Sequence, residues 1–125
     1  MWNDKKVDEL ERGFLELINN EGAACFIYYL NEKAIGFAQC QLRIDYVEGT
    51  HSSPIGYLEG IYIDKEYRNN GYAKELLYCC EQWAKDKKCV EFASDCELTN
   101  EDSWNFHMSM GFEEANRIIC FKKNI

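Results

Sequence analysis

A loop rich in asparagine and glycine carries the first chemistry that the sequence suggests. It reads Arg68-Asn69-Asn70-Gly71-Tyr72-Ala73 and leads from an expected strand into an expected helix. Asn and Gly tolerate a positive φ, so successive backbone N–H groups can turn toward one point, where the helix N-terminus adds partial positive charge. Arg68 adds a full charge, and the small residues Gly71 and Ala73 let a phosphate approach the backbone. The loop predicts a pyrophosphate cradle, although the same residues also form ordinary turns.

Two acidic residues lie where a ligand of such a loop would be expected. Glu59 interrupts the apolar strand expected at Ile55–Ile63, and Asp95 follows the short strand expected at Cys89–Ser94. The helix between these strands makes them a β-α-β unit, in which the strands are parallel. Open α/β sheets bind ligands at the carboxyl ends of parallel strands. Both acids are therefore candidate functional residues, and Gly60 inside the first strand indicates a bulge or a close approach of another group to the backbone.

A second pattern follows the loop further along the chain. It reads Asn100-x-x-Ser103-x-x-Phe106-His107-x-x-Met110-Gly111-Phe112. Together with Arg68-x-x-Gly71-x-Ala73 it resembles the GNAT superfamily of acetyl-CoA-dependent N-acetyltransferases, with a pyrophosphate loop and a later helix that ends in Gly-Phe. Further segments look like parts of the aminoglycoside 6'-N-acetyltransferases: Tyr46-Val47-Glu48-Gly49-Thr50, Leu58-Glu59-Gly60-Ile61-Tyr62, Glu81-x-Trp83-Ala84-Lys85 and Glu91-Phe92-Ala93-Ser94-Asp95. The resemblance runs from about Trp2 to Phe121 and implies a mixed α/β fold, a central mixed sheet with flanking helices.

The resemblance also implies an activity, a co-substrate and a set of site residues. The activity is direct transfer of an acetyl group from acetyl-CoA to the 6'-amine of an aminoglycoside within a ternary complex, which confers antibiotic resistance. One backbone N–H in the strand would polarise the thioester carbonyl, as an oxyanion donor does. The implied cofactor-binding residues are Ile61, Tyr62, Ile63, Arg68, Asn69, Asn70, Gly71, Tyr72, Ala73, Lys74 and Asn100. The implied substrate-binding residues are Trp2, Tyr46, Glu59 and Asp95.

Acetyl transfer to an amine needs two proton movements. An alkyl ammonium group must lose a proton before it can attack, and Glu59 or Asp95 can accept that proton through water. Either carboxylate can also attract the cation. The leaving thiolate needs a proton, and many GNAT members have a tyrosine where this chain has His107. Because the pKa of an unperturbed histidine is near neutrality, His107 is a candidate proton donor; the alternative is that it only packs in its helix.

The apolar pattern predicts the elements that hold these residues. Residues 4–19 are expected to be helical, because Val7, Leu10, Phe14, Leu17 and Ile18 recur at helical spacing. The order continues with strands at Ala24–Leu30 and Ala34–Ile44 (a hairpin), the strand Ile55–Ile63, a helix from about Gly71 to Asp86, the strand Cys89–Ser94, a helix at Asn100–Met110 and a last strand at Arg117–Lys122. The usual GNAT layout begins about one strand and one helix earlier. The sheet edge exposed in this way invites pairing with a second chain, so a homodimer is expected.

Composition narrows the classes of protein that remain. The chain has 125 residues, 46% of them apolar, which predicts a single domain over residues 1–125. No apolar run approaches the length of about 18 residues that a membrane span needs, and no h-region of a signal peptide follows Met1. The net charge of −8 argues against a nucleic-acid binder, which needs a basic face, and suits a cationic partner such as an aminoglycoside.

The seven cysteines do not have the spacing of a metal site or of a disulfide framework. Their number is odd, no C-x-x-C occurs, and the two histidines, His51 and His107, lie far apart. We expect reduced thiols in a cytoplasmic protein without a bound metal. Two alternatives to the aminoglycoside enzyme stay open: a GNAT enzyme that acts on a polyamine or another small amine, and a non-catalytic module that binds acyl-CoA.

Overall fold

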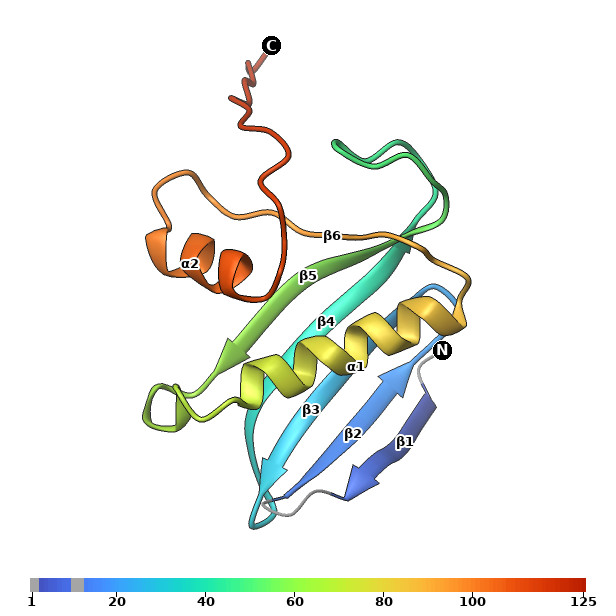
Figure 1. Cartoon of the computed structure of the whole chain (residues 1–125), viewed down its shortest axis with the longest axis vertical. Coiled ribbons are helices and arrows are strands. Elements are labelled where there is room, and N and C mark those ends of the chain that lie inside the picture. The colour runs from blue at the N-terminus through green and yellow to red at the C-terminus, as the bar shows by residue number, and fades with distance from the viewer. Residues whose placement is uncertain (1–2, 10–12) are drawn as a thin grey trace. The chain divides into compact units, whose positions relative to one another are not determined.

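The computed structural model describes residues 3–9 and 13–125 of the chain, with side chains from residue 13 onward. The chain divides into two compact units, residues 1–95 and residues 96–125. The first unit holds a six-stranded sheet in the sequential order β1 to β6, and the helix α1 lies across it (Figure 1). The second unit holds one helix, α2, which is Glu101–Ser109.

The sheet is antiparallel except at its last pair. Strands β1 to β5 pair with their sequence neighbours in antiparallel fashion, whereas β5 and β6 are parallel, as the β-α-β unit predicts. The strands are β1 Asn3–Glu9, β2 Phe14–Asn19, β3 Ala23–Leu30, β4 Lys33–Arg43, β5 Ile55–Ile63 and β6 Phe92–Ala93. The crossover from β5 to β6 contains the short 3-10 helix η1 (Lys65–Tyr67) and then α1 (Tyr72–Asp86).

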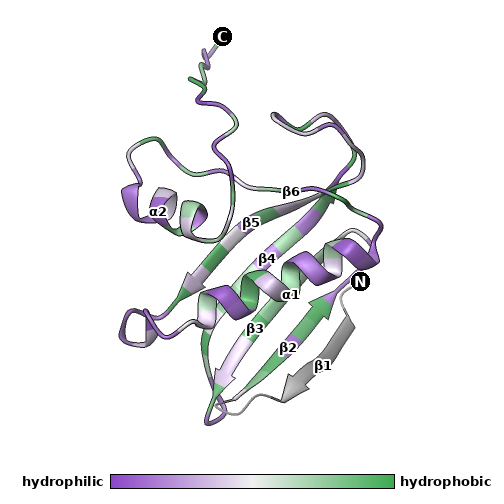
Figure 2. Cartoon of the chain, viewed as in Figure 1, coloured by the Kyte–Doolittle hydropathy of each residue, from purple (hydrophilic) through white to green (hydrophobic). Residues whose placement is uncertain are grey.

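The helix α1 covers one face of β3, β4 and β5. It buries its apolar stripe on the sheet, and the buried members are Tyr72, Leu76, Leu77, Cys80, Trp83 and Ala84. Hydrophobic residues recur along the strands beneath the helix, and hydrophobic and hydrophilic residues alternate along α1 (Figure 2). The ring of Tyr72 packs 4.8 Å from that of Tyr28 on β3, and Cys80 meets Cys40 on β4. This packing fixes the N-terminus of α1 relative to β5.

The prediction of a helix over residues 4–19 is wrong. The backbone forms two antiparallel strands there, β1 and β2, and β2 pairs in turn with β3. Residues 10–12 of the predicted helix lie outside the described residues. The segment Phe14-Leu15-Glu16-Leu17-Ile18 is too short for its apolar spacing to separate a helix from a strand, and pairing with the hairpin decides the outcome. Leu15 illustrates this, since it is fully buried opposite Tyr28 of β3.

Two further expected strands differ from the prediction: one forms no strand pairing in the described part of the chain, and the other pairs over only part of its length. The expected strand Arg117–Lys122 has no regular structure, and its residues are exposed. The expected strand Cys89–Ser94 shortens to the two residues of β6, which pair with Gly56 and Tyr57. The β3–β4 hairpin, the strand Ile55–Ile63 and the long helix agree with the prediction to within one or two residues.

The thiols belong to the packing of the fold. All seven cysteines are free; three are buried (Cys40, Cys80 and Cys89), two are half-buried (Cys25 and Cys79) and two are exposed (Cys96 and Cys120). Burial raises the pKa of Cys25 and Cys89, and a hydrogen bond with Cys40 together with burial raises that of Cys80. These thiols are therefore held in the protonated form, which is a poor nucleophile. Within the described residues, no helix is long and apolar enough to cross a membrane, and no group of three potential metal ligands occurs.

Candidate active site

A β-bulge lies at Glu59, in the middle of β5. The register of β4 and β5 pairs Cys40 with Leu58 but Gln39 with Gly60, so Glu59 has no partner on β4. A bulge of this kind inserts one extra residue into a strand and turns its direction locally. The sequence predicted an irregularity here from Gly60, and the structure confirms it.

The bulge changes which backbone amides face the outer edge of β5. Consecutive N–H groups in a strand point to opposite edges. The amide of Gly56 donates to Glu91 O at 3.2 Å, toward β6, whereas that of Asp64 donates to Ile35 O at 2.8 Å, toward β4. In a regular strand these two even-numbered amides would face the same edge. The extra residue at Glu59 shifts the alternation by one, so that beyond the bulge the odd-numbered amides face the edge that Gly56 faces. The amides of Ile61 and Ile63 consequently face the edge beyond the last β6 pair.

The amide of Tyr62 takes the opposite direction, toward β4. Of the three strand amides that the resemblance implies for the acyl group and pantetheine, those of Ile61 and Ile63 are thus directed to the edge. In the described part of the chain, pairing between β5 and β6 stops at Tyr57. The two strands therefore diverge beyond that point, and a slender extended ligand can lie along the edge of β5 as an added strand would.

The predicted pyrophosphate loop has the left-handed backbone that a cradle needs. Asn69 has a φ of 65° and Gly71 a φ of 85° with a ψ of 4°. The Nδ2 of Asn70 donates to Tyr67 O at 3.0 Å and to Arg68 O at 3.1 Å. The Nε of Arg68 donates to Ile63 O at 2.8 Å, and its guanidinium carbon lies 5.4 Å from the centre of the Tyr62 ring. Arg68 thereby ties the loop to the end of β5.

The N-terminus of α1 fits an anionic ligand. Gly71 is its N-cap residue, and no side chain caps the helix. A Cβ at Gly71 would meet no atom within 4 Å, so the space outside the turn is open. Gly71 and Lys74 are exposed, while Tyr72 is buried against the sheet. A diphosphate at this turn would be held by the backbone amides of the first helical turn and by the helix dipole, with Lys74 adding a charge.

Glu59 and Asp95 are joined by two residues that the sequence did not predict. A guanidinium nitrogen of Arg43, at the end of β4, lies 3.1 Å from Glu59 Oε2 and 3.4 Å from Oε1. The guanidinium carbon lies 3.4 Å from the centre of the Tyr57 ring. The hydroxyl of Tyr57 donates to Asp95 Oδ2 at 2.5 Å. The four side chains therefore form one chain of contacts from Glu59 to Asp95.

Burial and the neighbouring carboxylate hold Tyr57 in its protonated form. Its side chain is 6% exposed and belongs to a small apolar cluster with Val47 and Ile55. Burial raises the pKa of Tyr57 to about 12, helped by the hydrogen bond to Asp95, while Arg43 acts in the opposite direction. Because the phenol stays protonated at neutral pH, it always presents a donor to Asp95.

The loop that carries Tyr46 is tied to the strand that leads to Asp95. Tyr46 is 76% exposed, and the loop turns at Val47, where Thr50 donates both its amide and its hydroxyl to the Val47 carbonyl. Glu91 accepts from the His51 amide at 2.8 Å and from the Ser52 hydroxyl at a shorter distance. These bonds hold the pKa of Glu91 below its ordinary value. Trp2 lies outside the described residues.

In the second unit, Asn100 and His107 both use atoms in local hydrogen bonds. Asn100 is the N-cap of α2, and its Oδ1 accepts from the Ser103 amide at 3.0 Å. The Nδ1 of His107 lies 2.7 Å from Ser103 O, one helical turn earlier. Because a carbonyl oxygen only accepts, the proton of the neutral ring lies on Nδ1. The His107 ring also meets the rings of Phe106 and Phe112 edge-on, at 5.7 and 5.0 Å.

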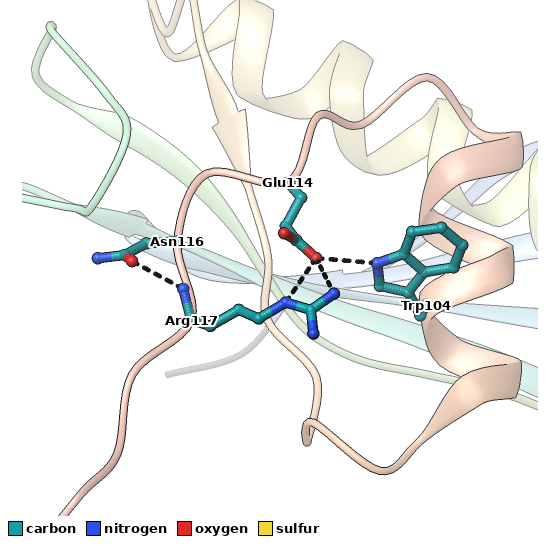
Figure 3. A network of polar contacts seen from close by, with 4 residues as sticks. All are labelled: Trp104, Glu114, Asn116 and Arg117. Atoms are coloured by element: carbon teal, nitrogen blue, oxygen red, sulfur yellow. Dashed lines mark hydrogen bonds and ion pairs between the residues drawn. The ribbon is translucent and has the colours of Figure 1, made fainter.

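The segment after α2 is held by one carboxylate. Glu114 Oε1 accepts from Trp104 Nε1 at 3.1 Å and from two guanidinium nitrogens of Arg117 at 3.0 and 2.8 Å (Figure 3). The hydrogen bonds from Arg117 and Trp104 lower the pKa of Glu114. Asn116 Oδ1 accepts from the Arg117 amide at 2.8 Å. Glu114 thereby fastens the chain that follows the Gly111-Phe112 pair to α2.

Comparisons with known proteins agree with this geometry. A family model described as the acetyltransferase (GNAT) family matches residues 1–112. An aminoglycoside N(6')-acetyltransferase type 1 from Acinetobacter haemolyticus is 37% identical over 125 residues, which cover 100% of this chain and 86% of that relative. A protein of the same name from Acinetobacter baumannii is 44% identical over 98 residues, or 78% of this chain and 67% of the relative.

Solved structures show the same fold. AAC(6')-Iy in complex with the bisubstrate analogue CoA-S-monomethyl-acetylneamine matches with a TM-score of 0.81 and 40% identity, over 85% of this chain and 72% of that one. The aminoglycoside 6'-N-acetyltransferase AAC(6')-Ih from Acinetobacter baumannii matches with a TM-score of 0.80 and 40% identity, over 86% and 74% of the two chains. The mixed α/β fold that the sequence predicts is thereby confirmed.

Proposed function

The chain belongs to the GNAT acetyltransferase family, and we propose that it transfers an acetyl group from acetyl-CoA to the 6'-amine of aminoglycoside antibiotics. The observation that carries this proposal is the combination of two features in the first unit. One is the uncapped α1 N-terminus behind Gly71, which suits a diphosphate. The other is the pair of carboxylates Glu59 and Asp95, which suits a polycation. The high identity to enzymes named for this activity supports both.

Each part of the ternary complex then has residues of this chain to hold it. The diphosphate of acetyl-CoA is bound at Arg68, Asn69, Asn70, Gly71, Tyr72, Ala73 and Lys74. The family resemblance adds Asn100 as a candidate cofactor-binding residue. The extended part of the co-substrate lies along the edge of β5, near the amides of Ile61 and Ile63. The aminoglycoside is bound by Trp2, Tyr46, Glu59 and Asp95. A metal takes no part in this scheme.

The chemistry requires three actions from the protein. Acetyl-CoA supplies the acetyl group as a thioester. Glu59 and Asp95 attract the ammonium group and accept its proton through water, so that the free amine can form the N–C bond as the C–S bond breaks. An edge amide of β5 donates to the carbonyl oxygen as negative charge develops on it. His107, whose Nδ1 proton is engaged by Ser103 O, can give a proton to the thiolate from Nε2 only when the ring is protonated on both nitrogens.

A thiol-release assay tests the proposed function. The purified chain is mixed with acetyl-CoA and either kanamycin or tobramycin, and free CoA is followed with a thiol reporter. We expect acceptor-dependent release, with kcat/KM for the aminoglycosides above that for a panel of polyamines and simple alkyl amines. If the folded protein releases no thiol above background, the assignment is refuted. If kcat/KM is higher for a polyamine than for the aminoglycosides, the substrate is a polyamine and not an aminoglycoside.

Two finer points belong to the same proposal. We expect a cytoplasmic location, since the free cysteines are consistent with a reducing compartment. We also expect a homodimer, since the sheet order ends on β1, an edge strand that can pair with another chain. Sedimentation at several protein concentrations tests the second point, and a monomer at all of them contradicts it.

A further inference from the structure

We propose that Arg43 and Tyr57 are positioning residues that hold the carboxylates of Glu59 and Asp95 in one fixed arrangement for the amino substrate. The inference rests on the proposed function and deepens it, since neither residue belongs to the site that the sequence motifs define. Both residues act through another group, and neither needs to touch the reacting atoms.

Arg43 fixes Glu59. One of its nitrogens lies within 3.4 Å of both carboxylate oxygens, and the guanidinium plane is supported by the Tyr57 ring at 3.4 Å. The side chains of Arg43 and Glu59 are 38% and 26% exposed. An ion pair with this exposure contributes little to folding stability. Its main consequence is geometric: Glu59 sits at the unpaired position of the bulge, where the sheet alone does not fix its direction.

Tyr57 fixes Asp95. Asp95 is exposed and follows a strand of only two residues, so its own segment gives it little support. The Tyr57 ring, in contrast, is buried, and its hydroxyl reaches Asp95 Oδ2 at 2.5 Å. A hydrogen bond to an ionised carboxylate is short and directional. The buried ring therefore transmits the rigidity of the sheet core to an exposed carboxylate.

The charge of the group shows whether Arg43 acts by holding Glu59 in place or only by repelling a cationic substrate. Two carboxylates and one guanidinium leave the group of four side chains with a charge of about −1, since Tyr57 is neutral. If Arg43 only repelled a polycationic substrate, Arg43→Met would lower the KM for the aminoglycoside. If Arg43 holds Glu59 in place, Arg43→Met raises that KM although the site becomes more negative. Arg43→Lys raises it as well, because an ammonium group keeps the charge but loses the planar stack on Tyr57.

Tyr57→Phe isolates the second half of the arrangement. It keeps the ring beneath Arg43 and removes only the hydroxyl. The lost hydrogen bond is one to a charged group at a partly buried position, so we expect kcat/KM for kanamycin to fall about 5–10-fold. The KM for acetyl-CoA stays within about twofold, because the hydroxyl faces the acceptor side. Tyr78→Phe, which alters an exposed tyrosine on α1, is the matched control and leaves both constants unchanged.

A double-mutant cycle shows whether Tyr57 acts through Asp95. In an Asp95→Asn background the acceptor of the hydrogen bond is neutral and weaker, so Tyr57→Phe then lowers kcat/KM by no more than about twofold. Thermal unfolding of every variant separates a loss of fold from a loss of alignment. A substrate-independent readout is alkaline titration of tyrosine absorbance: in Asp95→Asn, Tyr57 ionises at a lower pH than in the original chain.

The outcomes distinguish this inference from the proposed function. If the unaltered chain neither binds nor acetylates any aminoglycoside, the proposed function fails, and the inference fails with it. If the unaltered chain is active, two results overturn the inference alone. One is that Tyr57→Phe leaves kcat/KM unchanged; the other is that its effect persists in full in the Asp95→Asn background. A lower aminoglycoside KM in Arg43→Met likewise overturns the assignment of Arg43.

Discussion

Replacement of Gly71 by alanine tests the pyrophosphate cradle at its central residue. Gly71 is the N-cap of α1 and has a φ of 85° and a ψ of 4°, in the left-handed region. The added Cβ would meet no atom within 4 Å, so the perturbation is purely conformational. Any effect must come from the backbone of the turn, since no side-chain contact is made or lost.

The expected loss of stability follows from two opposing terms. An alanine in the left-handed region costs about 1–2 kcal/mol relative to glycine. Glycine also loses more chain entropy on folding than alanine does, and this difference favours the folded alanine variant by about 0.4–1 kcal/mol. The net destabilisation is therefore about 0–1.6 kcal/mol, or a fall in Tm of up to about 8 °C for a chain of this size. If the turn relaxes instead toward a negative φ, stability is partly recovered but the first-turn amides rotate away from the diphosphate.

The assay combines thermal unfolding with steady-state kinetics. Gly22→Ala is the matched control, because its Cβ also meets nothing within 4 Å and its φ is not in the left-handed region. We expect Gly71→Ala to raise the KM for acetyl-CoA several-fold while the KM for the aminoglycoside stays constant, and Gly22→Ala to change neither. A lower Tm with an unchanged acetyl-CoA KM would show that the turn serves folding only and would refute the cradle.

Three further predictions concern other parts of the chain. Glu91→Gln should destabilise the fold above pH 4.5, because hydrogen bonds from the Ser52 hydroxyl and the His51 amide lower the pKa of Glu91 in the folded state. The stability that the Glu91 carboxylate contributes disappears as the pH falls through its folded pKa, so the two chains should converge in acid. Tm measured against pH tests this, and a Tm difference that does not depend on pH contradicts it. His107→Ala should lower kcat with little change in the acetyl-CoA KM, and His107→Tyr should restore part of it; an unchanged kcat assigns the proton to water or another group. Gly56→Ala should destabilise the fold by about 1–3 kcal/mol by urea titration, because its Cβ would come within 2.7 Å of both Phe92 and Ala84.

The strands and helix nearest the site were predictable because local signals and packing agree there. The strand Ile55–Ile63 is rich in isoleucine and tyrosine, which favour strands, and the helix that follows has a stripe of apolar residues with the spacing of an α-helix. Residues 4–19 failed because their apolar spacing fits both a helix and two short strands. Only the pairing of β2 with β3, a contact between separate segments, decides between them.

The two carboxylates of the candidate site, Glu59 and Asp95, could be singled out from local features, but the residues that link them, Arg43 and Tyr57, could not. Glu59 stands out as an acid within an apolar strand, and Asp95 as an acid just after one. Arg43 lies sixteen residues from Glu59 in the sequence, and Tyr57 lies thirty-eight from Asp95. An arginine at the end of a strand and a tyrosine inside one are both ordinary in a sheet. Their role depends on the antiparallel register of β4 with β5 and on the parallel pairing of β6.

The bulge at Glu59 explains how a single strand can serve both halves of a bisubstrate reaction. In a regular strand, every second amide from Gly56 onward would face the β6 edge, and those of Ile61 and Ile63 would be used by β4. One extra residue reverses this order, so the amides of Ile61 and Ile63 face the diverging edge, where an acyl group can lie. The same extra residue carries the carboxylate that Arg43 contacts and that we propose as a binding group for the amine. Deletion of Gly60 would remove the extra residue, pair Glu59 with Gln39 and so move its carboxylate, while the amides of Ile61 and Ile63 keep facing the edge. We therefore expect the KM for the aminoglycoside to rise while the KM for acetyl-CoA stays constant in a variant that still folds, and an unchanged aminoglycoside KM would contradict the role of the bulge.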